Sequence, residues 1–183
     1  MLSNVKQALT TFAEDVVKQS KENLVKLNKV TSKELYNSIG YDLRVHQNSF
    51  SLSLLMEDYA DFVDKGVKGV GGTKKYKDGK KLTSPEPWKL KTVTNGTFKY
   101  TNKRPPHTAF NGWVIRKGIA PRTVGGQFTS RRGLMFAIAN SVYHTGLETT
   151  NFFTKPFESA FKDLPQDIIE AFGLDLKNII TDR

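Results

Sequence analysis

Three aspartates have the spacing in this sequence that comes closest to catalytic chemistry. Asp58, Asp61 and Asp64 recur every three residues, so on a helix they would share one face and could collect a divalent cation for hydrolysis. The same spacing is typical of the solvent-facing side of an amphipathic helix. The apolar residues between them are expected to form the buried side: Tyr59, Phe62 and Val63. We favour this second interpretation, and keep a small metal-dependent hydrolase or nuclease as a hypothesis.

Other catalytic or metal-binding patterns are missing from the sequence. His46, His107 and His144 lie far apart, and none has a second histidine or a cysteine four residues away. The chain has no cysteine, and no serine lies in a G-x-S-x-G motif. The glycines between residues 66 and 72 match neither a phosphate-binding loop nor a dinucleotide-binding motif. The sequence therefore predicts a protein without enzymatic activity, catalytic residues, metal or cofactor.

Positive charge is concentrated in the middle third of the chain, whose net charge is +10 overall. Residues 65–132 carry 17 Lys and Arg against 2 Asp and Glu, whereas residues 1–64 and 133–183 are both slightly acidic. Such a field favours a polyanionic neighbour or an acidic protein face, and the alternative is a solvated region that only keeps the protein soluble.

The basic residues of this region are the candidate contacts to a DNA channel or to a partner protein. The candidates are Lys74, Lys75, Lys77, Lys80, Lys81, Lys103, Arg104, Arg131 and Arg132. Lysine and arginine bind phosphates without reading bases, so the expected affinity is independent of sequence and sensitive to salt. The aromatic residues among them could stack on bases or hold the segment together: Tyr76, Trp88, Phe98 and Tyr100.

The first third of the chain predicts a helix, a helical turn and a hairpin. Residues 2–28 have the apolar periodicity of one long amphipathic helix, interrupted once by Ser20. Thr31 or Ser32 is expected to cap a short helical turn that ends at Gly40.

The register of the hairpin follows from its side-chain pattern. If Gln47 and Asn48 form a two-residue turn, all apolar side chains lie on one face and the polar ones on the other. The expected pairs are Val45 with Phe50, Leu43 with Leu52, and Tyr41 with Leu54.

A second hairpin is predicted inside a basic insertion at residues 67–105. Asn95-Gly96 suits a type I′ turn. This turn would pair Val93 with Phe98 and Lys91 with Tyr100. Prolines flank the segment, which is typical of an inserted arm and not of a central strand.

The remaining sequence predicts helices. Residues 107–118 should form a short helix that buries Phe110, Trp113 and Val114. Ser130 should cap a second helix that ends at Gly146. Residues 152–182 predict two or three helical segments separated at Pro156, Pro165 and Gly173.

Together these elements predict an α+β fold, in which a small antiparallel sheet packs against a long N-terminal helix and C-terminal helices. We expect residues 1–183 to form a single domain, with residues 67–105 as a flexible basic loop and β-hairpin arm. Residues 1–20 lack the features of a signal peptide and no segment is apolar enough to span a membrane, so a cytosol-like setting without membrane contact is expected.

Three short motifs resemble those of tail-completion or neck proteins, the head–tail joining components of tailed bacteriophages. "TSKELYNSI" (31–39) is similar to the family's TG-x-L-x-x-SI motif, "YADFVDKG" (59–66) resembles its YA-x-aromatic-aliphatic-acid-x-G motif, and "NFFTKPFESAF" (151–161) resembles its terminal aromatic–Pro–aromatic motif. The chain departs from the family at Ser32, which replaces a glycine, and in the greater length of segment 66–130. The matching positions that we expect to be structural are Leu35, Ile39, Tyr59, Phe62, Gly66, Pro156 and Phe157.

The resemblance implies a virion structural protein, made in the host cytoplasm, that self-associates into a ring around the DNA channel. It would join the portal side of the capsid to the tail, with portal or adaptor and tail proteins as partners. The basic segment would line the channel, in non-specific contact with genomic DNA, or dock onto a partner ring, and the sequence leaves both open. The alternative is a stand-alone, sequence-independent nucleic-acid-binding protein that uses residues 65–132.

Overall fold

The computed structural model divides the chain into two compact units, described here one at a time. Unit 1 comprises Met1–Ala60 and Asn151–Arg183, and unit 2 comprises Asp61–Thr150. The predicted arm, residues 67–105, lies within unit 2 together with the helices that follow it. The description covers residues 2–30, 33–47, 49–71, 92–120, 122, 125–128 and 130–181, and the backbone of four two-residue strands between residues 73 and 89.

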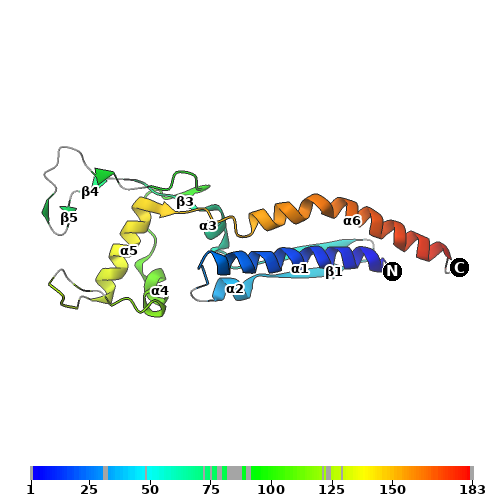
Figure 1. The fold of residues 1–183 in the computed structure, drawn as a ribbon, viewed down its shortest axis with the longest axis horizontal. Helices are drawn as coiled ribbons and strands as arrows, with labels where there is room; N and C mark the ends of the chain where they lie inside the picture. Colours follow the sequence, from blue (N-terminus) through cyan, green and yellow to red (C-terminus); the bar gives the residue numbers. More distant parts are fainter. Residues whose placement is uncertain are drawn as a thin grey trace. The chain divides into compact units, whose positions relative to one another are not determined.

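Unit 1 consists of two long helices and a hairpin. Helix α1 (Ser3–Lys26) packs along helix α6 (Thr154–Thr181), and both strands of the hairpin contact α1 (Figure 1). The strands are β1 (Gly40–Val45) and β2 (Phe50–Leu55), and the short helix α2 (Glu34–Ser38) precedes them. The predicted N-terminal helix is therefore confirmed to within two residues at each end.

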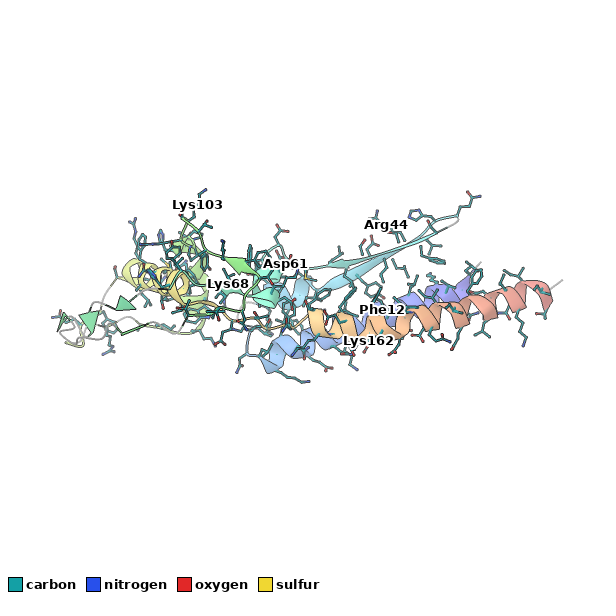
Figure 2. The ribbon with its side chains drawn as sticks, turned by 90° about the horizontal axis from the view of Figure 1, so that it is seen from above. Phe12, Arg44, Asp61, Lys68, Lys103 and Lys162 are labelled. Atoms are coloured by element: carbon teal, nitrogen blue, oxygen red, sulfur yellow. The ribbon has the colours of Figure 1, made fainter. Side chains whose placement is uncertain are left out.

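The core of unit 1 forms where the apolar side of α1 meets α6. Phe12 (labelled in Figure 2), Val16 and Leu164 are buried at its centre. Partly buried residues from both helices, from β2 and from the turn before α6 pack around them: Leu9, Leu52, Leu54, Phe153, Phe157, Ala160 and Ile168. The three-and-four spacing of apolar residues in α1 thus produces the helix and also its contact with α6.

The hairpin has the predicted register. Strand β1 pairs antiparallel with β2, and the Cα partners include Val45 with Phe50, Leu43 with Leu52 and Tyr41 with Leu54. Beyond the Val45–Phe50 pair, the His46 amide donates a hydrogen bond to the Ser49 carbonyl (2.9 Å). A slip by one residue would turn Leu52 and Leu54 away from α1, so burial of one face fixes the register. Asn48, at the predicted turn, lies outside the described residues.

Helix α2 begins differently from the prediction. Its N-cap is Lys33, which has a left-handed backbone (φ 57°) and makes no side-chain cap. The residues predicted to cap it, Thr31 and Ser32, lie outside the described part of the chain. Ser38 at its end bonds the Leu35 carbonyl and accepts the Glu57 amide, which ties α2 to the end of β2.

The prediction of two or three C-terminal segments is wrong, because α6 is one continuous helix from Thr154 to Thr181. Pro156 falls in the first turn, where its missing N–H is not needed. Pro165 lies inside the helix on its exposed side. A Cβ atom added at Gly173 would have no other atom within 4 Å, so the glycine is not required there by close packing. The packing of Leu164 and Ile168 against α1 stabilises the helix across both breaking residues.

Unit 2 is built around a small three-stranded sheet. Its central strand β3 (Val67–Lys68) pairs in parallel with β8 (Phe98–Lys99) and antiparallel with β9 (Gly146–Leu147). The other described elements are α3 (Ala60–Lys65), η1 (His107–Phe110), α4 (Asn111–Arg116) and α5 (Arg131–Thr145). The strands described by backbone alone are β4 (Thr73–Lys74), β5 (Tyr76–Lys77), β6 (Lys80–Lys81) and β7 (Trp88–Lys89).

The predicted burial of α3 is wrong for two aromatic residues. Tyr59 and Phe62 are exposed, at 39% and 44% of their surface, while Ala60 and Asp64 are buried. The buried pair lies one turn apart on one side of α3, so Phe62 falls on the opposite side. Phe62 contacts Phe98 of β8 there, with ring centroids 4.8 Å apart. Gly66 ends the helix with a positive φ, as predicted.

The predicted hairpin at Asn95-Gly96 does not form. Neither residue has the positive φ that a type I′ turn requires, and Phe98 pairs with Val67 instead of Val93. Gly96 is buried against the β3 backbone, where a Cβ would lie 2.8 Å from the Val67 amide nitrogen. The glycine thus permits a close approach of two backbones. Lys91, the predicted partner of Tyr100, lies outside the described residues.

The helices after this sheet agree with the prediction except at Phe110, which is only half-buried, and at Trp113. Val114 of α4 is buried, whereas Trp113 is 38% exposed because it projects from another side of this short helix. The Ser130 hydroxyl accepts the Gly133 amide (3.2 Å) and caps α5, as predicted. Gly146 ends α5 with φ 85°. The mixture of long helices and short strands confirms the α+β class.

Candidate nucleic-acid and partner interfaces

Five of the predicted basic contacts lie between residues 74 and 81, where the structure describes only the backbone of short strands. Lys74, Lys77, Lys80 and Lys81 belong to β4, β5 and β6, of which only the backbone is described. Lys75 lies outside the described residues. Strands β5 and β6 pair with each other, which brings Lys77 opposite Lys80.

The other four predicted contacts are exposed in unit 2. Lys103 projects outward (Figure 2), and Arg131 begins α5. The Arg104 guanidinium lies over the Tyr143 ring, 5.7 Å from its centroid, and that of Arg132 lies over Phe136 at the same distance. These two arginines are therefore positioned by rings of α5.

Sequence reasoning missed the rings that hold these arginines. No pattern in the sequence indicated that Tyr143 and Phe136 would lie under these arginines. Of the four aromatic residues proposed to stack on bases, Phe98 and Tyr100 are half-buried against Phe62 and Tyr143. Burial also raises the pKa of Tyr100 above its ordinary value. Nothing is described of the Tyr76 and Trp88 side chains.

The charge of the protein follows the structural division. Unit 2 carries 17 Lys and Arg against 5 Asp and Glu, a net charge of +12, and unit 1 carries 11 against 13, a net charge of −2. Within unit 2 the sequence has no acidic residue between Glu86 and Glu148. The ion pairs among described residues are Arg44–Asp42 and Lys65–Asp61, so none involves the cations between these two glutamates.

The three aspartates do not form one solvent-facing side. Asp64 is 2% exposed, and its main-chain carbonyl accepts the Thr150 amide (3.0 Å). Asp61 is exposed and pairs with Lys65 at 2.9 Å. The interpretation of the three as a single solvated face is thus wrong for Asp64. Within the described ranges, no group of three or more His, Cys, Asp or Glu side chains could hold a metal ion.

Most residues that match the phage motifs have structural positions. Leu35, Ile39 and Pro156 are buried, and the Phe157 ring packs edge-on against Phe12 with centroids 5.9 Å apart. Gly66 has φ 69°, and a Cβ there would lie 2.6 Å from the Thr149 hydroxyl oxygen.

An apolar groove of about 590 Å³ opens on the outer side of α1, bounded by Tyr36 of α2 and Tyr41 of β1. The ammonium group of Lys21 lies 5.4 Å from the Tyr36 ring centroid, and the Tyr41 hydroxyl donates to the Glu14 carboxylate (3.2 Å). Desolvation and the adjacent Glu14 carboxylate raise the pKa of Tyr41. The residues of α1 that line the groove are Glu14, Val17, Lys18, Lys21, Glu22, Val25 and Lys26.

A second apolar surface lies on α6, beside the face that packs on α1. We call it the α6 stripe, and it consists of the exposed residues Phe161, Ile169, Phe172, Leu176, Ile179 and Ile180. Ile169 and Ile180 are 65% and 72% exposed. Their spacing of three, four, seven and eight residues could have revealed the stripe in the sequence. The division predicted at Pro165 and Gly173 concealed it.

No family model, curated protein or solved structure matches this chain. Among the described residues, no helix is long and apolar enough to cross a membrane.

Proposed function

We propose that this chain is a structural subunit of the head–tail junction of a tailed bacteriophage, without catalytic activity. In this proposal copies of the chain assemble in the virion into a ring around the DNA channel, between the portal or adaptor and the tail proteins. The observation that carries the proposal is that unit 1 has two separate apolar surfaces, the α6 stripe and the groove on α1.

The α6 stripe is more than the packing of unit 1 requires. The side of α6 that faces α1 already supplies its share of the core through Leu164 and Ile168. The stripe adds six large apolar side chains to an exposed surface of the same helix. Contiguous apolar surface of this kind is typical of a protein–protein contact, because leaving it in water costs free energy.

The groove gives unit 1 a concave apolar surface on different elements. Val17, Val25 and the rings of Tyr36 and Tyr41 line it, while glutamates and lysines of α1 surround it. On α6, Lys162 lies next to the stripe, so it can pair with a groove glutamate when a stripe enters a groove. Contact between two different surfaces of identical chains propagates head to tail, and closes into a ring when the rotation permits.

The motif residues support this proposal through their positions. Leu35, Ile39, Pro156 and Phe157 contribute to the packing of unit 1, the unit that bears both apolar surfaces. These four of the seven motif residues thus help to maintain the shape of the unit that bears the proposed interface. Unit 2, with its net charge of +12, would supply the polycationic surface that a DNA channel or an acidic partner requires.

The test is the native mass of the full chain across a concentration series, in low and high salt. A closed oligomer of defined size is expected. Ile169→Glu should shift it towards monomer, since it places a charge in the apolar contact. Ser159→Glu, which adds the same charge at an exposed position of α6 that faces away from the stripe, should leave the mass unchanged. A monomer at every concentration would contradict self-assembly.

A stand-alone nucleic-acid-binding protein is the second candidate function. It is favoured by the cations between Glu86 and Glu148, which make no ion pair in the described part of the chain. This function requires tight DNA binding by a monomer, whereas a ring subunit should bind weakly until it assembles. The native mass of the DNA-bound species therefore separates the two.

A further inference from the structure

Three arginines of unit 2 share an unusual arrangement, in which each guanidinium lies over an aromatic ring. Arg104 lies over Tyr143, Arg122 over Phe128 and Arg132 over Phe136, with 5.7, 4.5 and 5.7 Å to the ring centroids. All three side chains are exposed. We call these contacts the arginine–ring pairs.

The pairs position the arginines without neutralising them. A ring attracts the cation through its quadrupole, but it removes no charge and accepts none of the N–H bonds at the guanidinium edge. A carboxylate would do both, and the described residues contain no ion pair to any of the three. The donors of each arginine thus remain available for an external anion.

Two of the rings lie on one side of α5. Phe136 and Tyr143 are seven residues apart, so they project from one side of the helix about 10 Å apart along its axis. Arg132 precedes Phe136 by one turn, so it joins the same row.

The segment that carries Arg104 is fixed along this row at two points. The Tyr143 hydroxyl donates to the Thr101 carbonyl (2.7 Å), and the His107 ring stacks on Phe136 with centroids 3.9 Å apart. Helix η1 also packs against α5. Arg104, between these two points, is therefore held near the row.

The third pair is held by the backbone. Arg122 and Phe128 face each other in an isolated antiparallel bridge. Cross-strand partners lie on the same face, so the ring supports the guanidinium directly. Since Phe128 is 69% exposed, this pair is built at the surface.

We infer that the arginine–ring pairs form a binding surface for the phosphodiester backbone of a nucleic acid. A guanidinium held flat on a ring presents its donor edge outward, and that edge can bind two phosphate oxygens at once. Because the surface reads only phosphates, binding should not depend on base sequence.

A nucleic acid fits this surface better than an acidic protein or an anionic membrane. A protein interface combines charges of both signs, whereas no acid occurs between Glu86 and Glu148. Binding to a membrane surface needs a helix with an apolar face free for lipid. Met135 and Ala139 of α5 are instead buried.

This inference rests on the proposed function only for its setting, since it specifies which residues would face the DNA of the channel. Its test uses the full chain and a 20-base-pair duplex of arbitrary sequence, with fluorescence anisotropy between 50 and 200 mM KCl. Each phosphate contact contributes about 0.9 to the slope of log K against log salt, so three contacts weaken binding about 40-fold over this range.

The variant Arg104→Gln/Arg122→Gln/Arg132→Gln should bind more weakly at 50 mM KCl, and its salt slope should fall by about 2.7. The matched control Lys6→Gln/Lys29→Gln/Lys155→Gln removes the same charge from exposed positions of unit 1 that lie outside the stripe and the groove. It should keep the wild-type slope. Equal losses in both variants would overturn the inference, since only net charge would then matter.

The role of the rings is tested by Phe128→Leu/Phe136→Leu, which keeps every charge. It should bind more weakly than wild type with a nearly unchanged salt slope, because the guanidiniums are present but less well positioned. Wild-type affinity in this variant would overturn the role of the rings. Polyglutamate that competes with DNA at an equal concentration of charge would overturn the choice of a nucleic acid.

Failure of this inference is distinguishable from failure of the proposed function. Ring-sized oligomers with no salt-dependent DNA binding would overturn the inference alone. A monomer whose DNA binding depends on the three arginines would contradict the ring and support the inference.

Discussion

The Asp175 carboxylate accepts the main-chain N–H of Asn4, with 3.1 Å from that nitrogen to each of its oxygens. It also accepts the Val5 amide (3.0 Å) and the Asn4 side-chain amide (2.8 Å). Helix α1 has no side-chain cap of its own at Leu2. A residue near the end of α6 therefore caps the first turn of α1 and binds the two ends of unit 1 together.

Replacing this cap should destabilise unit 1. In Asp175→Asn the side-chain oxygen can still accept an N–H group, but the NH₂ group is itself a donor and faces other donors. The negative charge of the aspartate at the start of α1 is also lost. We expect a melting temperature several degrees lower by circular dichroism. The matched control Asp163→Asn, an exposed acid of the same helix, should melt within about a degree of wild type. Equal melting of the two variants would contradict the capping role.

The same contact predicts a pH dependence. Burial by itself raises the pKa of Asp175, but the hydrogen bonds from Asn4, Val5 and Ser3 outweigh it and lower the pKa below its ordinary value of 3.8. The stabilisation from a lowered pKa is complete above the unfolded value and is lost as pH falls through the folded value. Urea unfolding between pH 6 and 2 should show wild type and Asp175→Asn converging below pH 3.8. A constant difference would contradict the lowered pKa.

Ser20→Ala should stabilise unit 1. The Ser20 hydroxyl is fully buried in α1 and has no hydrogen-bond partner among the described residues. Alanine removes this unsatisfied group and has a higher helix propensity, so the gain should be about 0.5–1.5 kcal/mol. The comparison is Ser38→Ala, which should destabilise because that hydroxyl bonds the Leu35 carbonyl and the Glu57 amide. Chemical denaturation of both variants tests the opposite signs.

Gly96→Ala should destabilise unit 2, because a Cβ would lie 2.8 Å from the Val67 amide nitrogen and 2.9 Å from the Gly66 carbonyl carbon. Both neighbours are backbone atoms, so the strands must separate, at a cost of about 1–3 kcal/mol. Gly173→Ala in α6, with nothing within 4 Å, should instead stabilise unit 1 by up to about 1 kcal/mol. Hydrogen exchange can follow the two units separately. Unchanged protection of β3 in Gly96→Ala would contradict the close approach.

Local patterns in the sequence were sufficient for α1, for the β1–β2 hairpin and for the start of α5. In each case the residues that determine the structure are neighbours along the chain or in the two paired strands of one hairpin. Ser130 needs only the Gly133 amide to cap its helix. The pairing of Leu43 with Leu52 follows from alternation, because a shift by one residue would expose the whole apolar face.

The same reasoning was wrong where contacts with residues far away in the sequence determine the local structure. Asn95-Gly96 is a strong local signal for a turn, but the Phe98 amide bonds the Gly66 carbonyl and the Val93 amide bonds the Thr145 carbonyl. Pairing with β3 and the end of α5 thus replaces the hairpin. Pro165 signals a helix end, yet the contact between α6 and α1 outweighs the loss of one hydrogen bond.

For the candidate surfaces, the sequence by itself determined how much charge each part of the chain carries. The tertiary structure determined which side chains lie next to one another. The sequence showed that positive charge is concentrated in the middle of the chain and that the acids lie elsewhere. Only the fold placed Arg104 over Tyr143 and the Asp175 carboxylate at Asn4. Charge is a sum over residues and can be counted along the chain. A contact between residues 39 or 171 positions apart depends on the packing of the helices and strands that carry them.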